Sequence, residues 1–166
     1  RKFVTGKYKK VWPDGNISQQ VDDKPYAGGP GMVMRAEPII KAVESVIKKI
    51  SNKKNSKYIV INFVPSAEKF DTKIAKNFSQ KYTDIIMICG RYEGVDARVD
   101  KILKTKKLSI GDYVLTGGEI PAMILVDSIS RQIEGVLGNY NSREEERISS
   151  STIYTRPRSE EHTSEL

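Results

Sequence analysis

The sequence of 166 residues predicts an α/β domain in which helices cover both faces of a parallel sheet. Two observations predict this fold class. Short apolar runs rich in β-branched residues, typical of strands buried on both faces, alternate with amphipathic helical segments. The length and the 38% content of hydrophobic residues are also enough for one core of ordinary size.

The first 31 residues are polar, basic and rich in glycine. Pro13-Asp14-Gly15 indicates a tight turn, and residues 22–31 hold too much Gly and Pro for a regular element. A helix is predicted from Glu37, because Pro38 suits its first turn. Apolar residues then recur with helical spacing at Ile39, Ile40, Val43, Ile47 and Ile50.

Strands and helices alternate after this helix. We predict a buried strand over residues 58–64, an amphipathic helix over 71–82 and a second buried strand over 84–89. Further elements follow in this order: a loop at 90–94, a short helix over 95–103, a strand over 108–115 that Gly111 interrupts or ends, and a loop at 116–118.

The last predicted helix runs from Pro121 to about Ile133 and is apolar on nearly every face. Such a helix must be buried by its own core or by a second subunit. We expect a dimer interface here, because a monomer exposing Met123, Leu125 and Ile129 would carry a large apolar patch.

The charge balance of 28 Lys and Arg against 21 Asp and Glu, a net +7, favours a polyanionic partner. The sequence has neither an apolar run of bilayer length nor a signal-peptide pattern, so we expect no membrane association and a cytoplasmic location. One cysteine excludes a disulfide framework within the chain and Cys-rich zinc sites.

Residues 158–166 match, in frame, the translation of a widely used sequencing adapter, and we expect them to be an artefact. They include the sole histidine, His162. Without it the chain has no Ser-His-Asp, Cys-His or imidazole chemistry, so proton transfer falls to a carboxylate, Lys, Tyr or water.

Glycines gather after two of the predicted strands: Gly90 and Gly94, then Gly111, Gly117 and Gly118. Their spacing fits neither a P-loop nor the dinucleotide fingerprint, and tight turns are the simpler interpretation of each motif alone. Ligands of open α/β sheets nevertheless bind at the carboxyl ends of the strands, where glycine permits close backbone approach. A nucleoside-like ligand held by backbone contacts is therefore our hypothesis.

Four charged residues beside the first glycine turn could form a solvated cluster: Arg91, Glu93, Asp96 and Arg98. We favour that interpretation for Asp96 and Arg98. Asp127 and Arg131 lie four residues apart on the apolar helix, and two alternatives stay open: an ion pair, or Arg131 facing a ligand. Cys89 ends a buried strand without a neighbouring histidine, so we interpret it as an inert core thiol.

Three stretches resemble the bacterial tRNA (guanine-N1)-methyltransferases, the TrmD family of the SPOUT class. They are residues 22–32, residues 88–96 with Gly90-Arg91-Tyr92-Glu93-Gly94, and residues 109–119, Ser109-Ile110-Gly111-Asp112-Tyr113-Val114-Leu115-Thr116-Gly117-Gly118-Glu119. Residues 131–138 and Tyr154-Thr155-Arg156-Pro157 also match. The resemblance implies a C-terminal trefoil knot, S-adenosyl-L-methionine as methyl donor, guanosine 37 of tRNA as substrate, and a homodimer with active sites between its subunits.

The resemblance also implies roles for individual residues. The cofactor pocket would comprise Gly90, Tyr92, Glu93, Gly94, Ile110, Gly111, Asp112, Tyr113, Val114, Leu115, Gly117, Gly118 and Pro121. The catalytic arginine would be Arg131. The family's general-base aspartate falls on Glu146, which keeps the carboxylate and adds a methylene. The family further suggests Mg²⁺, although no carboxylate spacing identifies a site and we assign no metal ligand.

On this basis residues 1–138 would be the knotted methyltransferase domain, 139–157 a linker and 158–166 the adapter artefact. Residues 11–20 look like an insertion relative to the family. We expect a fragment that lacks the family's first strand and helix and its C-terminal tRNA-binding domain, and is a poor enzyme by itself. The alternatives are a non-catalytic knotted RNA-binding module and a SPOUT methyltransferase with another RNA target.

Overall fold

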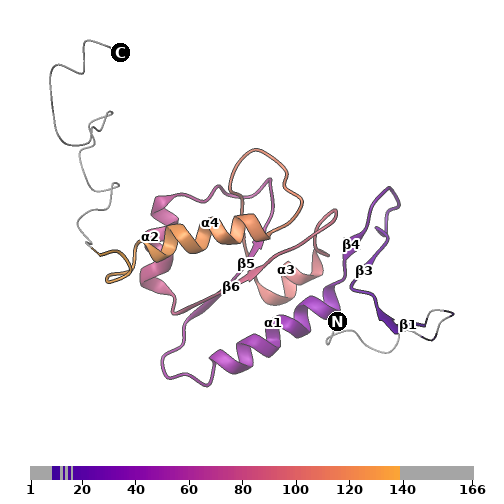
Figure 1. The fold of residues 1–166 in the computed structure, drawn as a ribbon, viewed down its shortest axis with the longest axis horizontal. Coiled ribbons are helices and arrows are strands. Elements are labelled where there is room, and N and C mark those ends of the chain that lie inside the picture. Colours follow the sequence, from indigo (N-terminus) through magenta and orange to yellow (C-terminus); the bar gives the residue numbers. More distant parts are fainter. Residues whose placement is uncertain (1–8, 12, 14, 16, 139–166) are drawn as a thin grey trace, which may run out of the picture. The chain divides into compact units, whose positions relative to one another are not determined.

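The computed structural model describes residues 9–11, 13, 15 and 17–138. The chain divides into two compact units, residues 1–133 and 134–166. All described helices and strands lie in the first unit (Figure 1). The described part of the second, residues 134–138, consists of turns and bends.

The N-terminal part contains two small antiparallel pairs, β1 (Lys9–Val11) with β2 (Ile17–Gln19) and β3 (Asp22–Asp23) with β4 (Val33–Met34). The prediction that residues 22–31 hold no regular element is therefore wrong at Asp22 and Asp23. These two residues pair with residues beyond the glycine-rich turn, and a local pattern does not reveal such a pairing.

The central sheet has three parallel strands in the order β6-β5-β7. Its strands are β5 (Tyr58–Phe63), β6 (Asp84–Ile88) and β7 (Lys106–Leu108). The helices are α1 (Ala36–Ile50), α2 (Thr72–Lys81), α3 (Arg98–Leu103) and α4 (Glu119–Ser130). Asp71 caps α2, because its carboxylate accepts a hydrogen bond of 2.8 Å from the backbone N–H of Ile74.

Helices cover both faces of the sheet, as predicted (Figure 1). Adjacent residues of β5 point to opposite faces: Ile61 joins the core formed with α2 and α4, and Val60 joins the core formed with α1 and α3. This alternation explains why β5 is a continuous apolar run, since both of its faces are buried.

Two predicted elements differ in the structure. The helix predicted over 95–103 begins at Arg98, because Val95 forms a bridge with Met34 of β4 and the Asp96 N–H donates to the Met34 carbonyl at 2.9 Å. The strand predicted over 108–115 ends at Leu108. Residues 109–118 are instead a loop, which is described with the site below.

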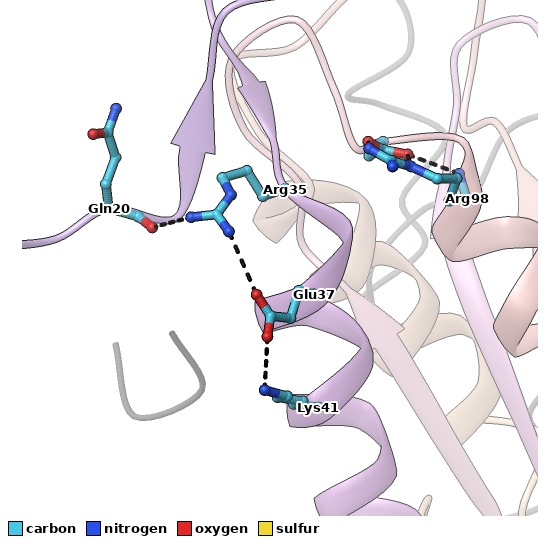
Figure 2. A network of polar contacts seen from close by, with 6 residues as sticks. Gln20, Arg35, Glu37, Lys41 and Arg98 are labelled. Atoms are coloured by element: carbon cyan, nitrogen blue, oxygen red, sulfur yellow. Dashed lines mark hydrogen bonds and ion pairs between the residues drawn. The ribbon is translucent and has the colours of Figure 1, made fainter. Parts of the chain in front are cut away.

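Polar contacts fix the start of α1 (Figure 2). The Arg35 guanidinium, 10% exposed, donates to the Gln20 carbonyl at 3.1 Å and pairs with Glu37 at 3.5 Å. Glu37 also pairs with Lys41, one turn along the helix, at 2.7 Å. At the start of α3, where a solvated charge cluster was expected, Asp96 and Arg98 form an ion pair.

The apolar helix α4 is only partly buried in the described structure. Leu125 (0% exposed) and Ile129 (7%) lie in the core with α2 and the sheet, so the expectation that a monomer would expose them is wrong. Met123 (70% exposed) does lie outside, together with Ile120, Ile124 and Val126. None of the described helices has the length and apolar character required to cross a membrane.

Candidate cofactor and methyl-transfer site

A cavity of about 350 Å³ opens at the carboxyl ends of β5, β6 and β7. The end of β5, the loop after β6 and the loop after β7 form its walls. Twelve of the thirteen predicted cofactor residues line it: Gly90, Tyr92, Glu93, Gly94, Ile110, Gly111, Tyr113, Val114, Leu115, Gly117, Gly118 and Pro121. The structure thus brings together two glycine-containing segments, the loops after β6 and β7, with the end of β5, which lies far from both in the sequence.

Asp112 is the predicted residue that does not line the cavity. Its side chain is 79% exposed and pairs with Lys69. Asp112 lies on an open loop where its carboxylate remains hydrated, and not within the strand predicted over residues 108–115.

The loops after β6 and β7 touch through their backbones. The Gly118 N–H donates to the Gly90 carbonyl at 2.9 Å, and Arg91 forms an antiparallel bridge with Gly117. A Cβ atom on Gly118 would lie 2.7 Å from the Cα of Cys89, so glycine is required for this approach. The two loops therefore act as one wall of the cavity.

An ion pair on the surface joins the loop after β6 to the first residue of α4. The guanidinium of Arg91 contacts the carboxylate of Glu119 at 2.8 Å and 3.0 Å. The pKa of Glu119 lies below its ordinary value, first because its own backbone N–H donates to the carboxylate and then because of Arg91. Since both side chains are about half exposed, this pair adds little stability and serves mainly to orient the loop relative to α4.

Local hydrogen bonds explain why residues 109–118 form a loop. The Ser109 hydroxyl donates to the Gly111 carbonyl at 2.9 Å and accepts from the Gly111 N–H at 3.2 Å. The Tyr113 hydroxyl donates to the Ile110 carbonyl at 3.3 Å, which folds the ring against Gly111. These contacts satisfy backbone groups that a strand would have paired with a neighbour.

The glycine-rich segment near the N-terminus contacts the loop after β6. The Glu93 N–H donates to the Met32 carbonyl at 3.0 Å, and a Cβ atom on Gly31 would lie 2.5 Å from the Glu93 carboxylate. Tyr92 adopts a left-handed conformation with φ of 61° and is 59% exposed at the cavity. A non-glycine residue in this region carries backbone strain, which is common at ligand sites.

A polar cluster that the sequence did not predict contributes three residues to the cavity lining: Asn62, Asp100 and Lys107. Asn62, 4% exposed within β5, donates to the Asp100 carboxylate at 2.9 Å. Asp100 also accepts from the Thr105 hydroxyl at 2.6 Å and pairs with Lys107 at 3.1 Å. Burial alone would raise the pKa of Asp100, but these hydrogen bonds outweigh it and the pKa is lowered. The signal in the sequence is an asparagine inside an otherwise apolar strand.

Arg131 follows the last residue of α4 and does not line the cavity. Ten residues separate it from Pro121 at the cavity wall, which is about 15 Å along a helix axis. Its Nε atom is buried without a hydrogen-bond partner among the described residues. Within that part of the chain no ion pair links Arg131 to Asp127, so the ion-pair alternative is not realised.

Two other candidate residues are Cys89 and Glu146. The pKa of the Cys89 thiol is raised, first by burial and then by the charge of Glu119, so the thiol stays protonated at neutral pH, although Cys89 is half-buried and lies outside the core clusters. Glu146 lies outside the described residues. The described residues bring no three His, Cys, Asp or Glu side chains together in a metal-binding group, and we assign no residue to Mg²⁺.

Comparison with protein families decides what this site belongs to. Residues 12–163 match the family model described as tRNA (Guanine-1)-methyltransferase TrmD. The chain belongs to the TrmD family. The match contains every segment that forms the cavity wall, together with Arg131 and Glu146.

Proteins named tRNA (guanine-N(1)-)-methyltransferase are similar to this TrmD-family chain. That of Carboxydothermus hydrogenoformans is 49% identical over 143 residues, which are 84% of this chain and 53% of that protein. That of Dictyoglomus turgidum is 51% identical over 83% of this chain and 54% of its own length. That of Clostridioides difficile is 43% identical over 95% of this chain and 64% of its own length. The chain thus spans little more than half the length of these relatives.

Proposed function

We propose that this chain carries the methyltransferase site of a TrmD enzyme, which transfers a methyl group from S-adenosyl-L-methionine to N1 of guanosine 37 in tRNA. The observation that carries the proposal is the glycine-lined cavity at the carboxyl ends of three parallel strands, in a chain of this family. A tRNA-modifying enzyme works in the cytoplasm, and we propose that location.

The cavity suits the cofactor in size and in lining. Its volume of about 350 Å³ lies in the range of small-molecule sites, about 300–1,000 Å³. Gly90 and the residues from Ile110 to Leu115 would hold the nucleoside through their backbone groups. Asp112 would contribute only its backbone, because its side chain points into solvent. When bound, S-adenosyl-L-methionine supplies an electrophilic methyl group on a sulfonium centre.

We further propose that residues 89–94 and 109–118 form part of a trefoil knot. The short backbone contact between Gly118 and Gly90, and the packing of Gly118 on Cys89, support a tight crossing of these segments. A knot would prevent the two walls of the cavity from separating without unthreading the chain.

The position of Arg131 supports a homodimer. Because Arg131 lies about 15 Å along the helix axis from the cavity of its own chain, we propose that it serves the cavity of a second subunit. The exposed apolar side chains of α4 give such a partner a surface to cover: Ile120, Met123, Ile124 and Val126.

The proposed chemistry divides two tasks between charged side chains. The N1–H of guanine is weakly acidic, so the Glu146 carboxylate would accept this proton. As negative charge develops on the guanine O6, the Arg131 guanidinium would donate a hydrogen bond to it. The cavity wall would hold the acceptor nitrogen in line with the methyl group. The Nε atom of Arg131 has no hydrogen-bond partner among the described residues, which supports a role for this guanidinium in binding.

Two measurements test this function. Titration calorimetry with S-adenosyl-L-methionine should show one site per chain, and methyl transfer should require guanosine rather than adenosine at position 37 of the tRNA. RNA binding without cofactor binding would favour the non-catalytic module, and equal transfer to both tRNAs would favour another RNA target. Since the chain spans about half of its relatives, we propose that transfer is efficient only when flanking segments like theirs are present.

Substitution of Arg131 and Glu146 separates catalysis from cofactor binding. Arg131→Ala should lower the rate of methyl transfer about 10²–10³-fold with the cofactor Kd unchanged, because its contact forms only in the transition state. Arg131→Lys is the matched control, which keeps the charge but loses the planar fork. Glu146→Gln should behave like Arg131→Ala. A parallel loss of cofactor binding in these variants would assign both residues to structural roles.

A further inference from the structure

Exposed lysines gather at the end of the sheet opposite the cavity. Five of them define what we call the lysine end: Lys48 and Lys49 in the last turn of α1, Lys54 in the turn that follows, Lys57 before β5, and Lys81 at the end of α2. Hydrogen bonds bring these segments together, since the Thr83 N–H donates to the Lys57 carbonyl at 2.8 Å and the Lys57 N–H donates to the Thr83 hydroxyl at 2.9 Å.

The charge of the lysine end is uncompensated. Of the neighbouring carboxylates, Asp84 is occupied by Lys53 at 2.8 Å, and the pKa of Asp84 is lowered chiefly by that hydrogen bond. No ion pair joins the five lysines to any carboxylate within the described residues. Elsewhere lysines do have acidic partners: Lys41, Lys69, Lys106 and Lys107.

Local stability does not account for the whole cluster. Lys48 and Lys49 complement the negative end of the α1 dipole, which explains their place in the last turn. Lys54 and Lys57 lie outside any helix. Lys81 stands over the ring of Tyr82 at 5.3 Å and remains exposed. Five like charges on one surface repel one another, and a polyanion would relieve that repulsion.

The distance to the cavity indicates how large the polyanion is. β5 has six residues and rises about 3.3 Å per residue, so the cavity and the lysine end lie about 20 Å apart along the strand. A single bound nucleotide does not reach from one to the other. A folded RNA of tRNA size does, while one of its bases occupies a cavity.

We propose that the lysine end binds the phosphate backbone of the RNA substrate, as a second contact remote from the methyl-transfer cavity. This inference rests on the proposed function, because that function supplies the RNA. The lysines would contribute affinity and orientation without reading sequence, since they meet phosphates and not base edges.

The test compares two sets of charge-matched variants by binding of a tRNA transcript with guanosine 37 across a range of salt concentrations. The first set replaces Lys48, Lys49, Lys54 and Lys57 with Gln. The control replaces four exposed lysines that lie apart from this end: Lys24, Lys73, Lys101 and Lys104. Each phosphate contact adds about 0.7–0.9 to the slope of log K against log salt, so the first set should lower that slope by about three and weaken binding at least about tenfold near 0.1 M salt. The control should change the slope by less than about one.

Two further variants keep the test decisive if the fourfold variant is unstable. Lys54→Gln with Lys57→Gln leaves α1 intact and should lower the slope by about 1.5. Arginine at all four positions retains the charge and should retain binding. Thermal melting of every variant verifies the fold.

Equal losses in the lysine-end and control sets would overturn the inference, since a general field would then explain RNA attraction. An unchanged slope of log K against log salt in the first set would also overturn the inference. It would be overturned as well if the lysine-end variants lost binding to phosphatidylserine vesicles while their RNA binding stayed intact. Calorimetry with S-adenosyl-L-methionine on the same samples distinguishes the two proposals. If the cofactor does not bind but the lysine-end variants still lose RNA binding, the proposed function is wrong. The contact between the lysine end and RNA phosphates is then still supported.

Discussion

Two adjacent glycines, Gly117 and Gly118, should respond differently to the same substitution. An alanine Cβ at position 118 would lie 2.7 Å from the Cα of Cys89 and 3.1 Å from the backbone nitrogen of Gly90. Ordinary contacts begin at about 3.4 Å, so backbone would have to shift by roughly 0.7 Å in a buried wall. Overpacking of this kind costs about 1–3 kcal/mol. Gly118→Ala should therefore lower the free energy of unfolding by that amount.

Gly117→Ala is the matched control because its new Cβ meets the end of a flexible side chain. The closest atom is Oε2 of Glu119, at 2.3 Å, and Glu119 is about half exposed and free to turn away. The cost is the surface pair with Arg91, at most about 1 kcal/mol. Alanine also restricts the unfolded chain, which stabilises by about 0.4–1 kcal/mol. The net change should stay within about 1 kcal/mol of zero.

Urea unfolding of the two variants measures this difference. The midpoint for Gly118→Ala should fall with the m-value unchanged, and its Tm should drop by roughly 2–12 °C for a chain of this size. The same variant should also bind S-adenosyl-L-methionine less tightly, since the shifted backbone belongs to the cavity wall. If Gly117→Ala loses as much stability as Gly118→Ala, the argument from backbone contact is refuted.

Two other predictions concern the core and the acid stability. Leu125→Ala should lower the free energy of unfolding by about 3–5 kcal/mol, because Leu125 is fully buried, whereas Met123→Ala should change it by under about 1 kcal/mol in a monomer and shift the dimer equilibrium in sedimentation. Equal effects of the two substitutions on unfolding would contradict the burial pattern. The pKa of Asp84 is lowered in the folded chain, chiefly by the hydrogen bond from Lys53, so its contribution to stability is present above the unfolded carboxyl pKa and is lost as the pH falls through the folded pKa. Asp84→Asn should be less stable than the parent at pH 7, and urea midpoints of the two should converge below about pH 4, whereas a constant gap would show that the carboxylate is not responsible.

The sequence predicted the helices in which apolar residues recur periodically and the strands in which apolar residues are continuous. α1 and α2 follow amphipathic patterns, and Asp71 marks the start of α2 because its side chain caps the helix. β5 and β6 are apolar runs that pack against helices on both faces, and β6 is only partly buried before Ile88. In each case the local pattern reflects the environment that the tertiary structure provides.

The elements predicted from the sequence were wrong where tertiary contacts override the local pattern. Residues 109–115 look like a strand because they are mostly apolar, but the Ser109 hydroxyl satisfies the backbone of Gly111 and ends the pairing. Val95 was expected in a helix, yet it pairs with Met34, which lies more than 60 residues earlier. The Asn62–Asp100 contact in the cavity lining joins residues 38 apart, and spacing alone does not predict such a pair.

Among the cavity residues, the glycines were predictable and the direction of the side chains was not. Glycines after strands indicate a ligand edge in any open α/β sheet. Whether Asp112 faces inward depends on how its loop folds, and here it pairs with Lys69 outside. Arg131 was identified as a candidate, but its distance from the cavity depends on the length and direction of α4.

The strand order β6-β5-β7 has a consequence for synthesis on the ribosome. β5 is central, yet both of its partners come later: Ile59 pairs with Ile85, and Ile61 pairs with Lys106. At about 5–20 residues per second, β5 leaves the ribosome seconds before either neighbour exists. During that interval β5 lacks both of the strand partners that the described residues provide, and this apolar, β-branched segment is open to pairing with another chain. The charged residues Lys54 and Lys57, just before the strand, then keep nascent chains apart, as flanking charges do beside other aggregation-prone strands.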